Sequence, residues 1–316
     1  MSLMVSQLWD VFGGGSNADG MTKVAALTED YLRDRIRETS VLNRVIPPVV
    51  LTEAQIERNT LNDFPLKRVE LEPDSKAFTL GFRGKGSAQF FEGRKYEVYF
   101  TKIETEHFKK TREELMTMRY PVMDVVNNNF VLDMQEQLDG LFRARLDASV
   151  TAATAITNAY TYAATITSAA DVANNFKDAV IAGVQAVVGK RRRVARLIMT
   201  ESTWMNLARL TPDKLGFDAV QRIAFGGTAP EKSFLGYEVI TTINSVGAGS
   251  VWANNRIYCV AEPGFLGSNF ILGDVQQEMK REGNMLEWYS WADQGTEIGN
   301  IFSTSVITLG STFITA

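Results

Sequence analysis

The feature that most constrains this chain is a pair of alternating segments that predicts one long, irregular β-hairpin, beginning at Phe64 and returning to Phe100. Residues 66–72 mix apolar and charged side chains, which alternate with period two from Arg68 onward, and residues 96–100 alternate in a similar way. Turn-forming residues interrupt the chain between them, at Pro73, Gly81, Gly84, Gly86 and Gly93. A two-stranded ribbon is only marginally stable in water, so we expect this one to lie on another subunit or on another element of the fold. The hairpin therefore predicts a protein that assembles.

A long uninterrupted helix is predicted after the hairpin, from Pro121 to Ala148. Pro121 suits the first turn of a helix, where its missing N–H group costs nothing. Apolar residues spaced by three or four form one stripe, which consists of Met123, Val126, Phe130, Met134, Leu138 and Leu141. At 1.5 Å per residue the helix would span roughly 42 Å. This length is unusual for a single-domain enzyme and suits the spine of a flat subunit.

The remaining segments predict a helical arm before the hairpin and a mixed α/β region after the long helix. We expect a helix over 22–44 that stops before Pro47, extended chain over 49–63 and a short helix over 107–119. A strand is predicted over 160–167, followed by a helix from a cap at Ser168 or Asp171 to Gly189. A strand over 196–200, a helix from a cap at Ser202 to Leu210 and a segment over 215–225 follow. Further strands are expected over 237–243, 256–261 and 270–272, and the tail (276–287 and 299–314) alternates as strands do.

Charge and composition limit the classes of function. The chain has 33 Lys and Arg against 37 Asp and Glu, a formal net charge of −4, which disfavours tight binding of nucleic acid through its phosphates. The amino terminus has no cationic region followed by an apolar block, so we expect no secretory signal. Residues 149–170 carry no charge, but they are rich in Thr and contain no Leu or Phe, so we expect no membrane span.

The side chains that carry most enzyme chemistry are scarce. His107 is the only histidine and Cys259 the only cysteine, so the chain cannot build a His/Cys zinc site or a disulfide within itself. We expect His107 to be a solvated residue at a helix start, and Cys259 to be a buried structural thiol in a reducing compartment. No Gly-x-Ser-x-Gly elbow occurs for a nucleophilic triad. The sequence therefore predicts no catalytic, cofactor-binding or metal-binding residue.

Four further motifs combine residue types that chemistry could use, and each also has a structural interpretation. The glycine-rich stretch 81–86 lacks the spacings of phosphate-binding loops, so we interpret it as the hairpin tip. Glu113 and Glu114 are adjacent, hence on different faces of a helix, and form no acid–base pair. Trp288 and Trp291 are expected to pack in a core or an interface. The cations at 190–193 either complement the dipole of the preceding helix or form a nucleic-acid patch or localisation signal.

The order of these elements resembles the major capsid proteins of tailed bacteriophages with the Hong Kong-type fold. The resemblance covers essentially the whole chain and is carried around the hairpin by residues 37–48 (RETSVLNRVIPP), 91–96 (FEGRKY) and 102–103 (KI). On the long helix and beyond, it is carried by residues 134–140 (MQEQLDG), 199–207 (MTESTWMNL) and 235–239 (LGYEV).

The resemblance implies an α+β fold, the phage major capsid (Hong Kong-type) fold. Its parts would be an N-terminal arm (1–63), a long β-hairpin extended loop (64–100), a peripheral domain with the spine helix (101–168), an α/β axial domain (169–275) and a return to the sheet of the peripheral domain (276–316). Some members of the family form Lys–Asn crosslinks between subunits, but no lysine near the hairpin matches a crosslinking motif. The arm begins within about twenty residues of Met1, so we expect a separate scaffolding protein or none.

The function implied by the resemblance is that of a major capsid protein, without enzymatic activity or cofactor. The chain would self-assemble as pentamers and hexamers into an icosahedral head shell that encloses double-stranded DNA without binding it tightly. Scaffolding, portal and decoration proteins are further candidate partners, and the location would be the virion after assembly in the host bacterial cytoplasm. Two alternatives stay open: an encapsulin-type shell that encloses cargo enzymes, and an α/β ligand-binding or enzymatic module built on residues 169–275.

Overall fold

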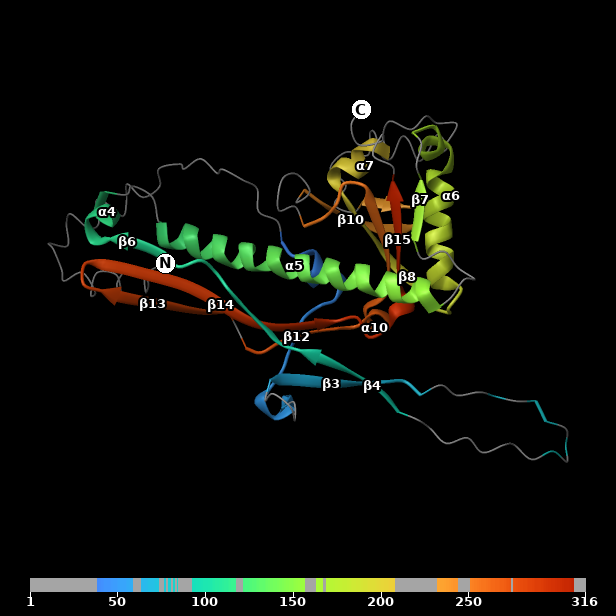
Figure 1. Cartoon of the computed structure of the whole chain (residues 1–316), viewed down its shortest axis with the longest axis horizontal. Helices are drawn as coiled ribbons and strands as arrows, with labels where there is room; N and C mark the ends of the chain where they lie inside the picture. Colours follow the sequence, from blue (N-terminus) through green and yellow to red (C-terminus); the bar gives the residue numbers. More distant parts are fainter. Residues whose placement is uncertain are drawn as a thin grey trace. The chain divides into compact units, whose positions relative to one another are not determined.

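The computed structural model of the chain describes residues 39–58, 64–73, 77, 79–80, 82, 84, 93–117, 122–156, 163–166, 169–207, 232–243, 251–273 and 275–309. Figure 1 labels the helices and strands of the chain. The described residues fall into two compact units. The first unit contains residues 104–133 and 276–291, and the second contains residues 39–103, 134–275 and 292–309. Helix α5 (Val122–Ile156) and strand β14 (Met285–Glu297) each contribute residues to both units.

In the first unit, a small antiparallel sheet covers an apolar core. The first half of β14 pairs with β13 (Gln276–Glu282) on one side and with β6 (Phe108–Thr111) on the other. Leu286 and Trp288 alternate along β14 on the buried face, as the period of two requires. They pack against partly buried apolar residues from β6 and two helices, which are Phe108, Leu115, Val126 and Phe130.

The helix predicted over 107–119 is wrong in its first half, because residues 108–111 form strand β6. Pairing with β14 places Phe108 opposite Trp288, and this tertiary pairing overrides the local helical preference. Helix α4 (Arg112–Thr117) begins only afterwards, at a reciprocal cap. The backbone N–H of Thr111 donates to Glu114 Oε2 over 3.1 Å, and the N–H of Glu114 donates to Thr111 Oγ1 over 3.3 Å.

The second unit is built on a mixed six-stranded sheet with the strand order β7-β15-β11-β8-β10-β9. In that order the strands are Ala163–Ile166, Thr304–Leu309, Arg256–Ala261, Val194–Thr200, Tyr237–Thr242 and Lys232–Phe234. The pairs β7/β15 and β8/β10 are parallel, and the other three pairs are antiparallel. The strands predicted near 160–167, 196–200, 237–243 and 256–261 are all present.

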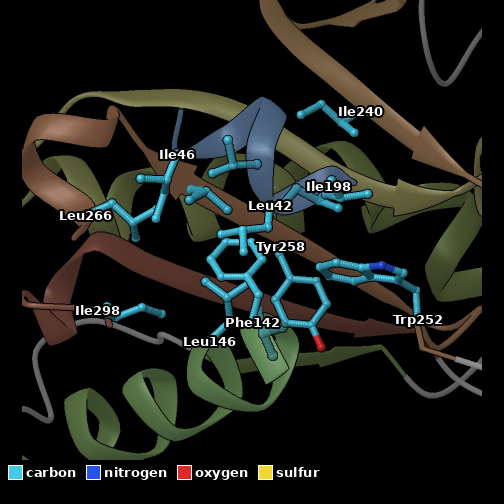
Figure 2. Close-up of a cluster of buried hydrophobic side chains, with 14 of the residues drawn as sticks. Leu42, Ile46, Phe142, Leu146, Ile198, Ile240, Trp252, Tyr258, Leu266 and Ile298 are labelled. Carbon is cyan, nitrogen blue, oxygen red and sulfur yellow. The ribbon is translucent and has the colours of Figure 1, made fainter. Parts of the chain in front are cut away.

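Alternate residues of the central strands pack on opposite faces of this sheet, so the sheet is covered on both sides. On one face, Ile198, Tyr258 and Val306 join a core with residues of α3 and of α5 (Figure 2). On the other face, residues such as Leu197, Cys259 and Ile307 join a second core, with Val180, Val184 and Val187 of helix α6 (Ala169–Val188). Near-continuous apolar runs in β8 and β11 follow from burial on both faces.

Helix α7 (Glu201–Leu207) starts one residue before the predicted cap, Ser202, which lies inside the helix. Thr200 acts as the cap instead, because its Oγ1 accepts a hydrogen bond from the backbone N–H of Thr203 over 3.3 Å. The predicted continuation of this helix to Leu210 and the segment predicted over 215–225 lie outside the described residues.

Helix α5 is longer than predicted and its buried stripe follows a different path. It contains 35 residues and continues to Ile156 through the uncharged segment, where Thr151 and Thr154 donate their hydroxyl groups to carbonyls four residues earlier. Met134 and Leu138 are buried as predicted, but Leu141 is exposed. An α-helix drifts relative to a seven-residue repeat, so the buried stripe passes to Phe142, one position after Leu141, and continues through Leu146, Val150 and Ala153.

The predicted arm helix over 22–44 does not run unbroken to its end. Ser40 has extended backbone angles and caps a separate five-residue helix, α3 (Val41–Val45), by accepting a hydrogen bond from the N–H of Asn43. The part of the prediction before residue 39 lies outside the described residues. Extended chain follows as predicted, with β1 (Val49–Val50), the 3-10 turn η1 (Glu53–Gln55) and β2 (Glu57–Arg58).

The predicted hairpin is confirmed at its base by β3 (Pro65–Leu71) and β4 (Arg94–Tyr99), and β2 adds a third strand. Strand β5 (Thr101–Glu104) follows and pairs with β14. The second half of β14 pairs with β12 (Ser268–Ile271), which follows the short helix α10 (Pro263–Leu266). The tail was expected to return to one sheet, but its strands join two sheets. Strands β13 and β14 pair with each other, whereas β15, which follows η2 (Ile301–Ser303), pairs with β11 and β7. Side chains of β15 pack into the apolar cores on both faces of that second sheet.

Candidate functional site

On one face of the hairpin base, charged side chains pair across the strands. Arg68 lies opposite Glu97, with 3.0 Å between Nε and Oε1, and also reaches Glu57. The hydroxyl group of Tyr99 and the Arg68 guanidinium both donate to Glu97 and lower the pKa of its carboxyl group. These exposed pairs set the register of the strands rather than adding much stability.

The other face of the hairpin base packs against glycines of the second unit. A Cβ atom on Gly299 would lie 2.5 Å from the ring of Tyr96, and one on Gly295 would lie 3.0 Å from Val98. The hydroxyl groups of Tyr96 and Ser268 lie 2.7 Å apart, and burial raises the pKa of Tyr96. The expectation that the ribbon lies on another element is therefore confirmed at its base.

Beyond the paired strands, every residue of the segment 72–84 that the structure describes is exposed. Leu80 and Phe82 are the large apolar side chains among them, and Phe82 has full exposure at 113%. The glycine-rich stretch 81–86 is described only at Phe82 and Gly84. Exposed apolar side chains at the far end of a ribbon are a surface suited to contact with another molecule.

A set of contacts that we call the arm anchor holds the short helix α3 at both of its ends. At the first end, the carboxylate of Asp139 on α5 accepts hydrogen bonds from Ser40 Oγ (2.7 Å), Val41 N (2.9 Å) and Leu42 N (2.9 Å). An anion at this position satisfies free N–H groups and complements the helix dipole. All of these groups are buried.

At the other end of the arm anchor, side chains bind the free carbonyls. Arg196 of β8 donates through Nη1 to the carbonyls of Arg44 (2.6 Å) and Val45 (3.2 Å). The buried amide of Asn269 donates to the carbonyl of Ile46 over 3.2 Å. Helix α3 is too short to be stable alone, so these contacts and its apolar face fix where the chain enters the second unit. Sequence reasoning missed Asp139, Arg196 and Asn269, because their partners are distant along the chain.

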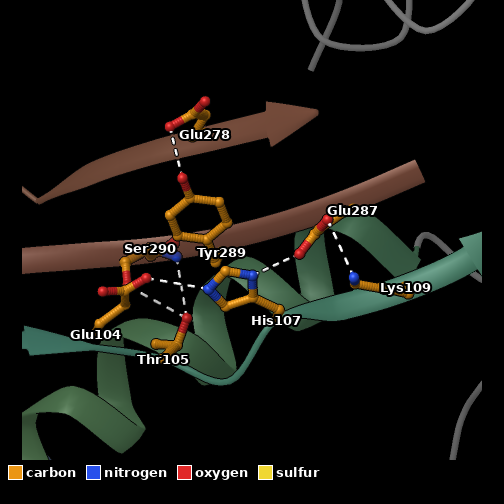
Figure 3. A network of polar contacts seen from close by, with 8 residues as sticks. All are labelled: Glu104, Thr105, His107, Lys109, Glu278, Glu287, Tyr289 and Ser290. Atoms are coloured by element: carbon orange, nitrogen blue, oxygen red, sulfur yellow. Dashed lines mark hydrogen bonds and ion pairs between the residues drawn. The ribbon is translucent and has the colours of Figure 1, made fainter. Parts of the chain in front are cut away.

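In the first unit, His107 joins a cluster of charged and aromatic groups beside β14 (Figure 3). Its Nδ1 lies 2.5 Å from Glu287 and its Nε2 lies 3.0 Å from Glu104, so the protonated ring donates to both carboxylates. These contacts, that with Glu287 first, raise the pKa of His107. The ring also stacks on Tyr289 at 4.2 Å, and a hydrogen bond to Glu278 raises the pKa of Tyr289 to about 12.

His107 is thus not the helix-start residue that we expected, because it precedes a strand. The imidazole is nonetheless partly exposed and binds carboxylates of its own sheet, which is a structural arrangement. Within the described part of the chain, no group of His, Cys, Asp and Glu side chains is placed to hold a metal ion.

The remaining candidates occupy structural positions. Cys259 is fully buried, as predicted, and burial raises the pKa of its thiol to about 12. Trp288 lies in the core of the first unit, and Trp291 stacks against Tyr289 at 5.5 Å. Glu113 accepts a hydrogen bond from Asn284, whereas the neighbouring Glu114 caps helix α4. Across the described helices, none is both long and apolar enough to cross a bilayer.

The fold is similar to that of solved structures from bacteriophages. No protein-family model and no curated protein sequence matches the chain. A solved chain of Microbacterium phage Oxtober96 has a TM-score of 0.63 and 12% identity, covering 93% of this chain and 99% of that one. A chain from the capsid of cyanophage P-SCSP1u has a TM-score of 0.62 and 9% identity, covering 90% and 91%. A chain from the mature capsid of bacteriophage PhiM1 has a TM-score of 0.61 and 9% identity, covering 90% and 91%.

The fold is therefore the α+β fold of phage capsid proteins, as the sequence predicted. The similarity extends over at least nine-tenths of this chain and of the two capsid chains. A chain from the capsid of an empty GTA particle has the same fold, with a TM-score of 0.58 and 14% identity, covering 94% of this chain and 99% of that chain.

Proposed function

We propose that this chain is the major capsid protein of a tailed bacteriophage and that its copies form an icosahedral head shell around packaged double-stranded DNA. The observation that carries the proposal is the fold, which covers at least nine-tenths of this chain and of the phage capsid chains. Closed symmetry then multiplies each modest contact between subunits over many copies. The proposed role is structural and involves no catalysis.

The hairpin supports this role because it is built to be completed by a neighbour. Its base packs on glycines of its own subunit, whereas the described residues further out are exposed. Full burial of one large apolar side chain such as Phe82 against a neighbouring subunit would stabilise the association by about 1.5–3 kcal/mol. We propose that Leu80 and Phe82 make this contact on an adjacent subunit.

The parts of the subunit would then have distinct roles. Residues 1–63 form the N-terminal arm, 64–100 the extended loop, 101–168 the peripheral domain with the spine helix, and 169–275 the axial domain that meets its copies in pentamers and hexamers. Residues 276–297 complete the peripheral sheet, and β15 belongs with the axial sheet that it pairs with. Portal, scaffolding and decoration proteins would be further partners, and the virion the final location after assembly in the host bacterial cytoplasm.

The experiment that tests the proposal is expression of the chain alone and with its neighbouring genes, followed by light scattering and negative-stain electron microscopy. We expect closed shells. A persistent monomer or small oligomer under both conditions would contradict the proposal and favour the α/β module on residues 169–275. Shells that contain a cargo enzyme and no nucleic acid would favour the encapsulin-type alternative.

A second experiment tests the hairpin. The double substitution Leu80→Ser and Phe82→Ser removes the exposed apolar side chains without changing the paired strands, and we expect folded subunits that form few or no shells. Thr79→Ser in the same stretch is the matched control and should leave the yield of shells unchanged. Normal shells from the double variant, and from a deletion of residues 73–93, would show that the hairpin does not clasp a neighbour.

A further inference from the structure

The four consecutive cations Lys190–Arg193, which we call the basic turn, connect helix α6 to strand β8 in the second unit. Arg191 is exposed, and the side chain of Arg193 has 83% exposure. The sequence left open whether these cations complement the helix dipole or bind a polyanion. The structure separates the two interpretations.

Three carbonyls at the end of α6 are satisfied without the cationic side chains. The carbonyls of Gln185, Val187 and Val188 accept hydrogen bonds from the backbone N–H groups of the next residues, Gly189, Lys190 and Arg191, over 2.8, 3.2 and 2.7 Å. The dipole itself amounts to about half a negative charge at this end. It therefore offsets only a small part of the positive charge in the basic turn.

Arg191 occupies a backbone conformation that favours a different residue. Its φ of 60° lies in the left-handed region, which is strained for residues with a Cβ atom and suits glycine. No described residue makes an ion pair or a hydrogen bond with its guanidinium. A strained, exposed arginine whose side chain has no polar partner among the described residues suggests a role outside the folded chain.

The rest of the turn holds its charge at one place. Lys190 Nζ lies 5.1 Å from the centre of the Phe302 ring, which fixes a cation beside the exposed arginines. Among the described residues, the carboxylate paired with Arg193 is that of Glu262, at 3.5 Å. Even with Arg192 left out of the count, Lys190, Arg191 and Arg193 outweigh this carboxylate by two charges.

We propose that the basic turn is a weak, sequence-independent binding site for the phosphate backbone of nucleic acid. Without the four cations of the basic turn, the rest of the chain carries a net charge of −8. This negative charge does not prevent phosphate binding at the turn, because charges more than about 10 Å away are screened at 0.1 M salt. Three neighbouring cations match successive phosphates and read no bases. The choice of nucleic acid over another polyanion rests on the proposed function, in which the chain encloses DNA.

The test measures binding of a short, fluorescently labelled double-stranded DNA to the unassembled subunit over a series of salt concentrations. Each phosphate contact contributes about −0.9 to the slope of log K against log salt concentration. The double variant Arg191→Gln/Arg193→Gln should therefore weaken binding and make the slope shallower by about 2. Glu262→Gln should strengthen binding, because it removes the opposing carboxylate.

Two controls separate a local site from a general effect of charge. Arg58→Gln/Arg94→Gln removes two exposed arginines from the hairpin strands, gives the same net charge and should leave the slope unchanged. Arg191→Gly should weaken DNA binding while keeping a melting temperature no lower than that of the wild type, since glycine suits the left-handed backbone. Equal slopes for the two double variants, or no DNA binding by the wild type at low salt, would overturn the proposal.

Competition with polyglutamate tests the class of partner. If polyglutamate displaces the DNA at equal or lower charge concentration, the site prefers acidic polypeptide and the assignment to nucleic acid is wrong. Shell formation by each variant is scored separately by electron microscopy. DNA binding through the basic turn without shell formation would support this inference and contradict the proposed function. Shell formation without DNA binding through the basic turn would support the proposed function and contradict this inference.

Discussion

Replacing Asp139 by alanine tests whether the arm anchor holds the start of the second unit. The carboxylate accepts three hydrogen bonds, from the hydroxyl of Ser40 and from the backbone N–H groups of Val41 and Leu42, and all three donors belong to buried residues. Without it, two backbone N–H groups are left without an acceptor, and each such group costs about 1–3 kcal/mol. Ser40 still caps the N–H of Asn43, so the helix keeps one of its own caps.

We therefore expect Asp139→Ala to lower the free energy of unfolding by about 3–5 kcal/mol, near the upper end for a single substitution. Asp139→Asn keeps one acceptor oxygen but places a donor against a donor, so a loss of about 1–3 kcal/mol is expected. Urea unfolding followed by tryptophan fluorescence measures the loss. Hydrogen exchange of the amides of residues 41–46 should accelerate in parallel and locates the effect.

Gln137→Ala is the matched control, because Gln137 is exposed on the same helix and should change stability by no more than about 0.5 kcal/mol. A loss of less than about 1 kcal/mol for Asp139→Ala would refute the reasoning. A large loss of stability with unchanged hydrogen exchange at the amides of Val41 and Leu42 would also refute the reasoning, because the carboxylate would then stabilise another part of the chain.

Three further predictions concern close packing and titration. Gly299→Ala should destabilise the hairpin base by about 1–3 kcal/mol in urea unfolding, because its Cβ would lie 2.5 Å from the Tyr96 ring, whereas Gly140→Ala has open space and should cost nothing. The pKa of His107 is raised by folding, so its contribution to stability is fully present below its unfolded pKa of about 6.5 and disappears as the pH rises through the folded pKa. Nuclear magnetic resonance titration of this single imidazole should show the raised pKa, and a folded value at or below 6.5 would contradict the ion pairs. Cys259, with a thiol pKa raised to about 12 by burial, should resist thiol reagents at pH 8 until the chain is unfolded, and rapid labelling of native protein would show that it is accessible.

The parts of the fold that the sequence predicted depend on local patterns. Strand β11 was predicted with its observed bounds, Arg256–Ala261, and the base of the hairpin was predicted from alternation with period two. The burial of Cys259 follows from the apolar run around it. The order of these elements and the motifs at residues 37–48, 91–96, 134–140 and 199–207 resemble those of phage capsid proteins, and this resemblance predicted the fold.

The errors arose where a distant partner decided the outcome. Residues 108–111 form a strand because β14 lies beside them, and the buried stripe of α5 passes to Phe142 because the sheet of the second unit lies there. Strand β15 was expected to join the same sheet as β13, but the surfaces available for burial place it between β11 and β7 in the sheet of the second unit.

The sequence alone determined the alternation of the strands, the long helix and the buried cysteine, because each is encoded by neighbouring residues. The class of fold followed from the resemblance of the whole chain to phage capsid proteins. The tertiary structure decided the contacts that position the candidate surfaces. Asp139 meets Val41 across 98 residues of chain, and Arg196 meets Arg44 across 152. No periodicity links residues so far apart, because hydrogen bonds between them depend on the folded geometry and not on their spacing along the chain.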